Sequence, residues 1–425
     1  MTREKRDPRL MELEGHLSVG DAASRRKAWD EFARAGLPLV EPVRQARGKV
    51  HVTFLWRPGS PLRAPTLYTP VANPFAGEME LRQLGRTGVW YRSLQLPKAV
   101  RAMYGFSPLP VPGSGPRAPS WSDYFRSLRA DPYHRERIHM AKDPEDPEDV
   151  EASISVLSLP QAPRTPWNEV RAPAFWRKSQ VRFRSPHLPG SRSVRVFLPP
   201  GAGRRSFDGN LVVVLDGVTY TSAVPTPAIV RNLIRAGRLE PTVVVAVGNA
   251  PGSRDLELLH NAHFAEFLAE ELLPSIRARY GVRVEASRTL LGGSSLGGMA
   301  SAHAALRYPQ TFGAVLAQSG AYTWTDSGKS SGAPTLMREY AQAPRGPTRF
   351  YLSAGTFEDV IFPGSRMSLL TGVRKLRDVL VRKGYPVEYA EFEGGHDFAC
   401  WSADFATGLL ALLGRGRPRK VRRTA

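Results

Sequence analysis

The sequence predicts an α/β domain built on a mostly parallel sheet, preceded by a small antiparallel β-domain. Two observations predict the larger domain. Continuous apolar runs are typical of strands that are buried on both faces, and four are present, at residues 211–215, 242–247, 314–317 and 350–352. Helical patterns lie between these runs, such as the apolar positions from Phe264 to Ile276 that end at Gly281. Alternating strands and helices favour a sheet covered on both sides.

The smaller domain is predicted by a different pattern. Residues 49–56 alternate between apolar and polar, and a second β-like run covers residues 89–96. Residues 107–166 are dense in proline and charge, which is typical of a linker. The predicted organisation is a flexible N-terminus (1–25), a β-domain (26–110), a linker (111–165), an α/β domain (166–413) and a basic disordered tail (414–425).

Composition excludes several function classes. The chain has 425 residues, with 59 Lys and Arg against 39 Asp and Glu, a formal net charge of +20. Six of the basic residues lie after Gly414, and no nucleic-acid-binding motif accompanies them, so we expect no nucleic-acid function. The single cysteine, Cys400, excludes an intramolecular disulfide and a cysteine-based metal site. The charged N-terminus and the lack of long apolar stretches predict a cytoplasmic protein without a membrane anchor.

One motif carries chemistry. The short strand 289–291 runs into Gly292-Gly293-Ser294-Ser295-Leu296-Gly297-Gly298, and a helix rich in small residues follows. This is G-x-S-x-G in a strand, turn and helix context, where the serine hydroxyl projects from a sharp turn. Glycines flank the turn because a Cβ there would collide with the neighbouring strand and helix. Ser295 is therefore the candidate nucleophile.

The base is found by elimination. In α/β-hydrolases the order along the chain is Ser, acid, His, and only His303 and His396 follow Ser295. His303 lies eight residues further along the same predicted helix, ~12 Å away, and cannot reach the hydroxyl. His396 lies in a glycine-containing loop directly after the β-like run 387–392, where the base is expected.

The acid and the oxyanion hole are less sharply defined. The acid should follow the strand 349–353, where Glu358 and Asp359 are adjacent and spacing alone cannot rank them. The oxyanion hole should use the backbone N–H of Leu296 and one from the loop after strand 211–215, for which we select Gly217.

The sequence also resembles the enterochelin (ferric enterobactin) esterases, relatives of the esterase D type hydrolases, from about residue 26 to 413. The motifs that carry the resemblance are 52–57, 158–163, 215–217, 254–258 with Asn261 and Phe264, 318–324, and 394–397 with Cys400 and Trp401. The resemblance implies an immunoglobulin-like β-sandwich before an α/β-hydrolase domain, in a cytoplasmic enzyme that hydrolyses the trilactone of an iron-loaded catecholate siderophore. It also favours Glu358 as the acid, whereas Ser294 stands where the family usually has Gln.

A substrate of that class is anionic and aromatic, so its site should offer Arg and aromatic faces. Arg254 and Trp324 are the candidate substrate-binding residues on loops expected above Ser295. We expect no cofactor and no metal in the chemistry, because iron arrives with the substrate.

Two other functions fit parts of the sequence. A carbohydrate or feruloyl ester hydrolase would use the same catalytic motif, with the β-domain binding glycan. A polyanion-binding protein on a hydrolase scaffold would explain the net charge of +20. The sequence fixes neither the siderophore nor the oligomeric state.

Overall fold

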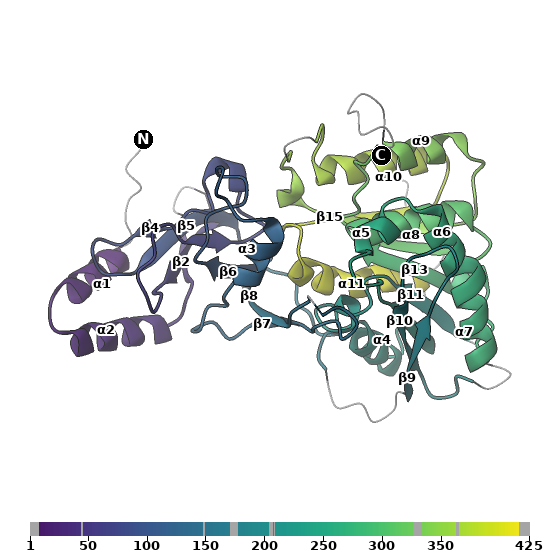
Figure 1. Cartoon of the computed structure of the whole chain (residues 1–425), viewed down its shortest axis with the longest axis horizontal. Coiled ribbons are helices and arrows are strands. Elements are labelled where there is room, and N and C mark those ends of the chain that lie inside the picture. The colour runs from purple at the N-terminus through teal and green to yellow at the C-terminus, as the bar shows by residue number, and fades with distance from the viewer. Residues whose placement is uncertain are drawn as a thin grey trace. The chain divides into compact units, whose positions relative to one another are not determined.

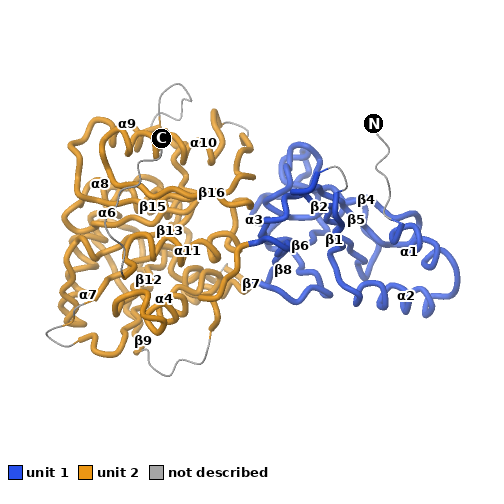
Figure 2. Tube along the Cα trace, turned by 180° about the vertical axis from the view of Figure 1, so that it is seen from behind, with its two compact units in different colours: residues 1–138, 153–162 blue, residues 139–152, 163–425 orange. Residues whose placement is uncertain are grey.

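The computed structural model describes residues 8–43, 46–147, 149–170, 177–203, 207, 209–325, 334–362 and 365–415. The chain forms two compact units, one of residues 1–138 and 153–162, the other of residues 139–152 and 163–425 (Figure 2). Within the described part, no helix is both long enough and apolar enough to cross a membrane. The cytoplasmic location stays a prediction.

Two helices open the first unit, α1 (Pro8–Ser18) and α2 (Ala22–Arg34), where the sequence predicted flexible chain up to residue 25. That prediction is wrong for residues 8–25. Leu10, Leu13 and Leu17 form one apolar stripe, which is buried in a cluster with Trp29. The Asp21 carboxylate accepts a hydrogen bond from the Ser24 N–H and caps α2.

The rest of the first unit is a β-sandwich, as predicted. One sheet has the order β1-β2-β5-β4 and the other β3-β6-β8-β7. Their aromatic side chains face one another: the rings of Phe54 and Tyr104 lie 5.0 Å apart, and those of Trp56 and Phe106 stack at 5.4 Å. The strands are β1 (Leu39–Pro42), β2 (Lys49–Trp56), β3 (Thr66–Tyr68), β4 (Arg82–Gln83), β5 (Trp90–Pro97), β6 (Arg101–Ser107), β7 (Arg137–Met140) and β8 (Ala152–Ser158).

The segment 111–165 is not a linker, which corrects the sequence prediction. It contains helix α3 (Trp121–Ser127) and strands β7 and β8, and β8 pairs antiparallel with β6. In the proline and acidic run, the described residues 143–147 and 149 are held locally, because the Asp149 carboxylate accepts from the Asp143 N–H at 2.7 Å. The apolar residues that follow it, from Ile154 to Leu157, are buried in the sandwich.

The second unit is built on an eight-stranded sheet of order β9-β10-β12-β11-β13-β14-β15-β16 (Figure 1). Strand β10 is antiparallel to both of its neighbours, and the strands from β11 to β16 are parallel. The strands are β9 (Arg177–Phe183), β10 (Arg192–Leu198), β11 (Asn210–Val214), β12 (Thr242–Val247), β13 (Thr289–Ser294), β14 (Ala314–Gln318), β15 (Arg349–Gly355) and β16 (Val387–Phe392). This is the predicted α/β-hydrolase fold.

Successive side chains of a strand point to opposite faces of the sheet, and helices cover both of these faces. Val212 and Val214 pack in a core with α4 and α11, whereas Leu211 and Val213 pack in a second core with α6 to α10. The helices are α4 (Thr226–Arg235), α5 (Arg254–Leu258), α6 (Ala262–Glu266), a π-helical turn (Phe267–Leu272), α7 (Leu273–Tyr280), α8 (Leu296–Arg307), α9 (Thr335–Gln342), α10 (Leu369–Arg382) and α11 (Phe398–Leu413).

The beginning of the predicted basic tail is ordered. Arg415 donates two hydrogen bonds to the Glu240 carboxylate at 2.6 Å, and its backbone N–H donates to the carbonyl of Arg238. Residues 416–425, which hold the other basic residues of the tail, lie outside the described residues.

Candidate active site

Ser295 occupies the sharp turn between β13 and α8. Its φ of 55° and ψ of −121° are a backbone conformation that non-glycine residues rarely adopt. Hydrogen bonds on both sides of the residue hold this conformation: its N–H donates to the carbonyl of Gln318 at 3.0 Å, and its carbonyl accepts from the N–H of Ala321 at 3.0 Å. The strained turn exposes the hydroxyl at the carboxyl end of the sheet, which is the position that a nucleophile needs.

The glycines around Ser295 are required by close packing. A Cβ on Gly293 would lie 2.9 Å from the carbonyl carbon of Gly297, and a Cβ on Gly298 would lie 3.2 Å from the Cα of Gly320. Gly297 lies against the loop after β11, where a Cβ on Gly297 would be 3.3 Å from the Asp216 carboxylate. Small residues therefore allow α8 to start directly against β13 and beside the loop where the oxyanion hole was predicted.

A buried carboxylate holds the predicted base. The Nδ1 atom of His396 lies 2.8 Å from Oε2 of Glu358, and the Glu358 side chain is only 1% exposed. Its other oxygen, Oε1, accepts from the Gly355 N–H at 2.7 Å and from the Ser319 hydroxyl at 2.6 Å. Asp359 is exposed and accepts instead from the Ser368 hydroxyl. Of the two carboxylates that spacing left open, Glu358 is the one in contact with His396.

Two further residues support this pair. The indole N–H of Trp401 donates to the Ser319 hydroxyl at 2.9 Å, and the Trp401 ring meets the His396 ring edge to face with centroids 4.8 Å apart. Ser319 also has a positive φ of 50°. Neither residue has a role predicted from the sequence, although both lie in motifs that carry the family resemblance.

The predicted nucleophile and the predicted base are not joined directly. Among the residues that the structure describes, no hydrogen bond links the Ser295 hydroxyl to the His396 ring. Catalytic hydrogen bonds are often long without substrate and tighten in the Michaelis complex. The structure thus brings together the predicted base, His396, and the predicted acid, Glu358, with Ser295 on its own strained turn.

The predicted oxyanion hole is corrected in one position. The N–H of Gly217 donates to the carbonyl of Val247 at 2.8 Å, so it is already engaged within the backbone. The next amide, that of Val218, has no acceptor among the described residues, and neither has that of Leu296, the first residue of α8. Val218, rather than Gly217, is therefore the candidate second donor.

Arg254 braces the loop that carries this donor. Its Nε and Nη2 atoms donate to the two oxygens of Asp216 at 2.7 and 2.8 Å, and Asn249 donates to the same carboxylate. Burial acts to lower the pKa of Arg254, but the negative charges around it, chiefly that of Asp216 and then that of Asp255, together raise the pKa. The remaining nitrogen, Nη1, lies 3.7 Å from the exposed carboxylate of Asp255. The contact with the substrate stays a prediction for Arg254.

Trp324 is half-buried and belongs to a stack of three rings. Its ring stacks on His260 with centroids 5.0 Å apart, and His260 stacks on His303 at 4.1 Å. Burial lowers the pKa of His303 to about 3, so this imidazole is neutral near pH 7. One face of Trp324 is thus occupied by His260, and its contact with a substrate also stays a prediction.

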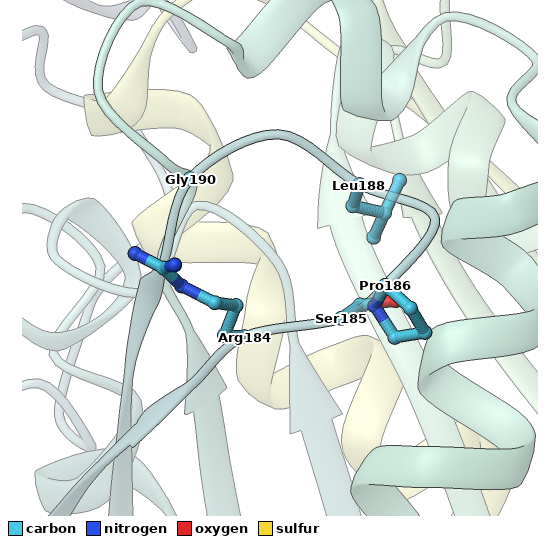
Figure 3. Close-up of a pocket in the computed structure, with 5 residues that line it drawn as sticks. All are labelled: Arg184, Ser185, Pro186, Leu188 and Gly190. Atoms are coloured by element: carbon cyan, nitrogen blue, oxygen red, sulfur yellow. The ribbon is translucent and has the colours of Figure 1, made fainter.

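A separate hollow lies beside the turn between β9 and β10. It is lined by Arg184, Ser185, Pro186, Leu188 and Gly190 (Figure 3). None of the candidate catalytic residues lines it, and we assign it no function.

Comparison with known proteins decides the family. Residues 185–412, more than half of the chain, match the family model described as putative esterase. The chain belongs to this esterase family. Residues 51–168 match a second model, the N-terminal domain of enterochelin esterase, so the resemblance inferred from the sequence is confirmed. This esterase family member is therefore an ester hydrolase.

The esterase has relatives over nearly its whole length. It is 29% identical to an iron(III) salmochelin esterase of Escherichia coli O6:H1, over 95% of this chain and 98% of the relative. An iron(III) enterobactin esterase of Escherichia coli K12 is 28% identical, over 78% of this chain and 81% of the relative. A crystal structure of the Shigella flexneri enterobactin esterase, in the presence of 2,3-dihydroxy-N-benzoyl-glycine, superposes with a TM-score of 0.70 and 25% identity, over 90% of this chain and 98% of that one.

Proposed function

We propose that the chain is a serine esterase that hydrolyses the lactone bonds of a ferric catecholate siderophore and thereby releases its iron. Ser295 is the nucleophile, His396 the general base and Glu358 the acid that orients it. The observation that carries this proposal is the buried Glu358 carboxylate, which accepts from His396 while two other donors fix its second oxygen.

The proposed chemistry follows from these contacts. Glu358 holds the proton of His396 on Nδ1, which leaves Nε2 free to accept the proton of the Ser295 hydroxyl. The serine oxygen attacks the lactone carbonyl, and the N–H groups of Leu296 and Val218 stabilise the oxyanion. His396 then returns the proton to the departing alkoxide, which leaves an acyl-enzyme. Water attacks this ester in the same way, with His396 as base, and releases the acid and Ser295.

Several observations support the siderophore as substrate. The relative named as a salmochelin esterase matches 95% of this chain, and residues 51–168 match the family model described as the N-terminal domain of enterochelin esterase. A match over both domains favours this substrate over carbohydrate or feruloyl esters. The Arg254 guanidinium is a cation held by Asp216. Its longer ion pair with the exposed Asp255 carboxylate is weak, so an anionic ligand could take the place of that carboxylate.

The test is single-turnover hydrolysis of ferric enterobactin, beside p-nitrophenyl butyrate and a feruloyl ester. Ser295→Ala should abolish cleavage of the trilactone, and Ser294→Ala is the matched control because Ser294 is the buried neighbour on β13. Rapid cleavage by the wild type and by Ser294→Ala is expected. Turnover of the simple esters without the trilactone would refute the substrate, and equal loss in both variants would refute Ser295 as nucleophile.

A further inference from the structure

We propose that His260, His303 and Glu339 form a binding site for a divalent first-row transition metal ion such as Zn²⁺. His260 lies between α5 and α6, His303 on α8 and Glu339 on α9, so three separate elements of the second unit converge there (Figure 1). Each residue offers one ligand atom, and these atoms all lie within 4.8 Å of one another. The site goes beyond the proposed esterase activity and does not depend on it.

The first support is an unsatisfied imidazole. His303 is only 3% exposed, and neither of its ring nitrogens has a hydrogen-bond partner among the described residues. The fully buried side-chain atoms without a partner in the described part of the chain lie elsewhere, and His303 contributes a ring nitrogen whose lone pair no described residue engages. A metal ion on the lone pair of His303 would satisfy this ring.

The second support is the arrangement of the other two ligands. The Nε2 atom of His260 already lies 2.8 Å from Oε2 of Glu339, so an imidazole and a carboxylate are paired beside His303. The rings of His260 and His303 stack at 4.1 Å and 23°, which places the two imidazoles face to face. His260 is held in a positive-φ conformation, at 53°, which is rare for a residue with a side chain.

The donor set selects the class of ion. Two imidazole nitrogens and one carboxylate oxygen suit Zn²⁺ and its neighbours in the first transition row, whereas Mg²⁺ and Ca²⁺ prefer oxygen ligands. Bonds of about 2.0 to 2.1 Å in a tetrahedral site place the ligand atoms roughly 3.4 Å apart. Closing the site from 4.8 Å therefore needs side-chain movements of about an ångström and a rotation of the stacked His260 and His303 rings, because the lone pair of an imidazole lies in its ring plane. A water would take the fourth position.

The site would be structural rather than catalytic. His303 lies two helical turns beyond Ser295 on α8, so the ion would not reach the reacting atoms. It would instead tie α8, α9 and the α5–α6 loop together, and fix the His260 ring on which Trp324 stacks. This would revise the expectation from the sequence that the chain holds no metal.

The experiment uses the full, untagged chain, stripped with chelator and titrated with Zn²⁺ or Co²⁺ by calorimetry and absorption spectroscopy. We expect one equivalent to bind, the Co²⁺ form to show the visible bands of a four-coordinate site, and the Trp fluorescence to change at the same stoichiometry. Glu339→Gln and His303→Leu should lose this binding. His263→Ala is the matched control, because His263 is exposed and stacks on His187 instead.

Glu339 is half-exposed on α9, so Glu339→Gln is expected to fold and is the deciding variant. Its folding is checked by circular dichroism and by hydrolysis of p-nitrophenyl butyrate in the absence of metal. Failure of the wild type to bind one equivalent would overturn the proposal. So would binding that persists in folded Glu339→Gln, or binding that is lost equally in His263→Ala.

Discussion

Replacing Glu358 by Gln tests the site most directly, because the structure fixes how the new amide would lie. Oε1 of Glu358 accepts from a backbone N–H, that of Gly355, and from the Ser319 hydroxyl. The amide oxygen of Gln must take that place, so its NH₂ group faces Nδ1 of His396. Nδ1 must then accept a hydrogen bond, which moves the ring proton to Nε2. An imidazole with its proton on Nε2 cannot accept the proton of Ser295.

The expected loss follows from this wrong tautomer. In serine hydrolases the equivalent change lowers kcat about 10⁴-fold, and we expect roughly 10³- to 10⁴-fold here, or about 4 to 5.5 kcal/mol in activation free energy. The assay is single-turnover hydrolysis of ferric enterobactin and p-nitrophenyl butyrate, with urea unfolding to show that stability is little changed. Asp359→Asn is the control, since Asp359 is exposed and contacts Ser368. A loss below tenfold in Glu358→Gln, or an equal loss in Asp359→Asn, would refute the reasoning.

Three further outcomes are expected. Val218→Pro removes one backbone N–H, and proline can adopt the φ of −65° found at this position, so kcat should fall about 10²- to 10³-fold. Val218→Ala keeps the N–H and should change kcat little. Pre-steady-state kinetics would measure both variants. Glu257→Gln leaves the fully buried guanidinium of Arg192 without its counter-ion, and should cost about 3 to 5 kcal/mol in the free energy of unfolding by urea titration. Burial raises the pKa of Asp131, so the folded chain holds the carboxyl proton of Asp131 more tightly than the unfolded chain does. The contribution of Asp131 to stability therefore falls as the pH rises above about 4. The stability of the wild type relative to Asp131→Asn should therefore decrease between pH 4.5 and 7, and an increase would contradict the assignment.

The strands that the sequence predicted well are those with a strong local signal. The continuous apolar run at 211–215 corresponds to β11, because a strand buried on both faces needs apolar residues at every position. Strand β8 was missed because the prolines and acidic residues at 143–149 dominate the composition just before it. Whether such a segment is a linker or a tight turn depends on whether the chain on either side of it forms strands that pair with other strands. Here β8 pairs with β6, about fifty residues earlier in the chain.

The candidate site shows the same division between local and non-local information. Ser295 and His396 could be selected as candidates from the sequence because their motifs and chain order are local properties. Glu358 and Asp359 could not be ranked by spacing, because adjacent side chains point in different directions once the chain turns through Thr356–Glu358. Gly217 was selected wrongly because its N–H bonds to Val247 at the end of another strand, a pairing that no local pattern encodes.

The nucleophile and the base are connected through α11 rather than through a contact of their own. This helix begins two residues after His396, and its Trp401 donates to Ser319, the residue that also donates to Glu358. The Trp401 carbonyl accepts from the side chain of Gln318, whose own carbonyl accepts from the N–H of Ser295. Trp401 of α11 thus contacts Ser319 through its side chain and Gln318 through its backbone carbonyl, and Gln318 in turn accepts from the N–H of Ser295. The alignment of Ser295 with His396 therefore depends on how α11 packs on the sheet, which explains why the residues that set it lie in the Q-S-G and C-W motifs and not in G-x-S-x-G.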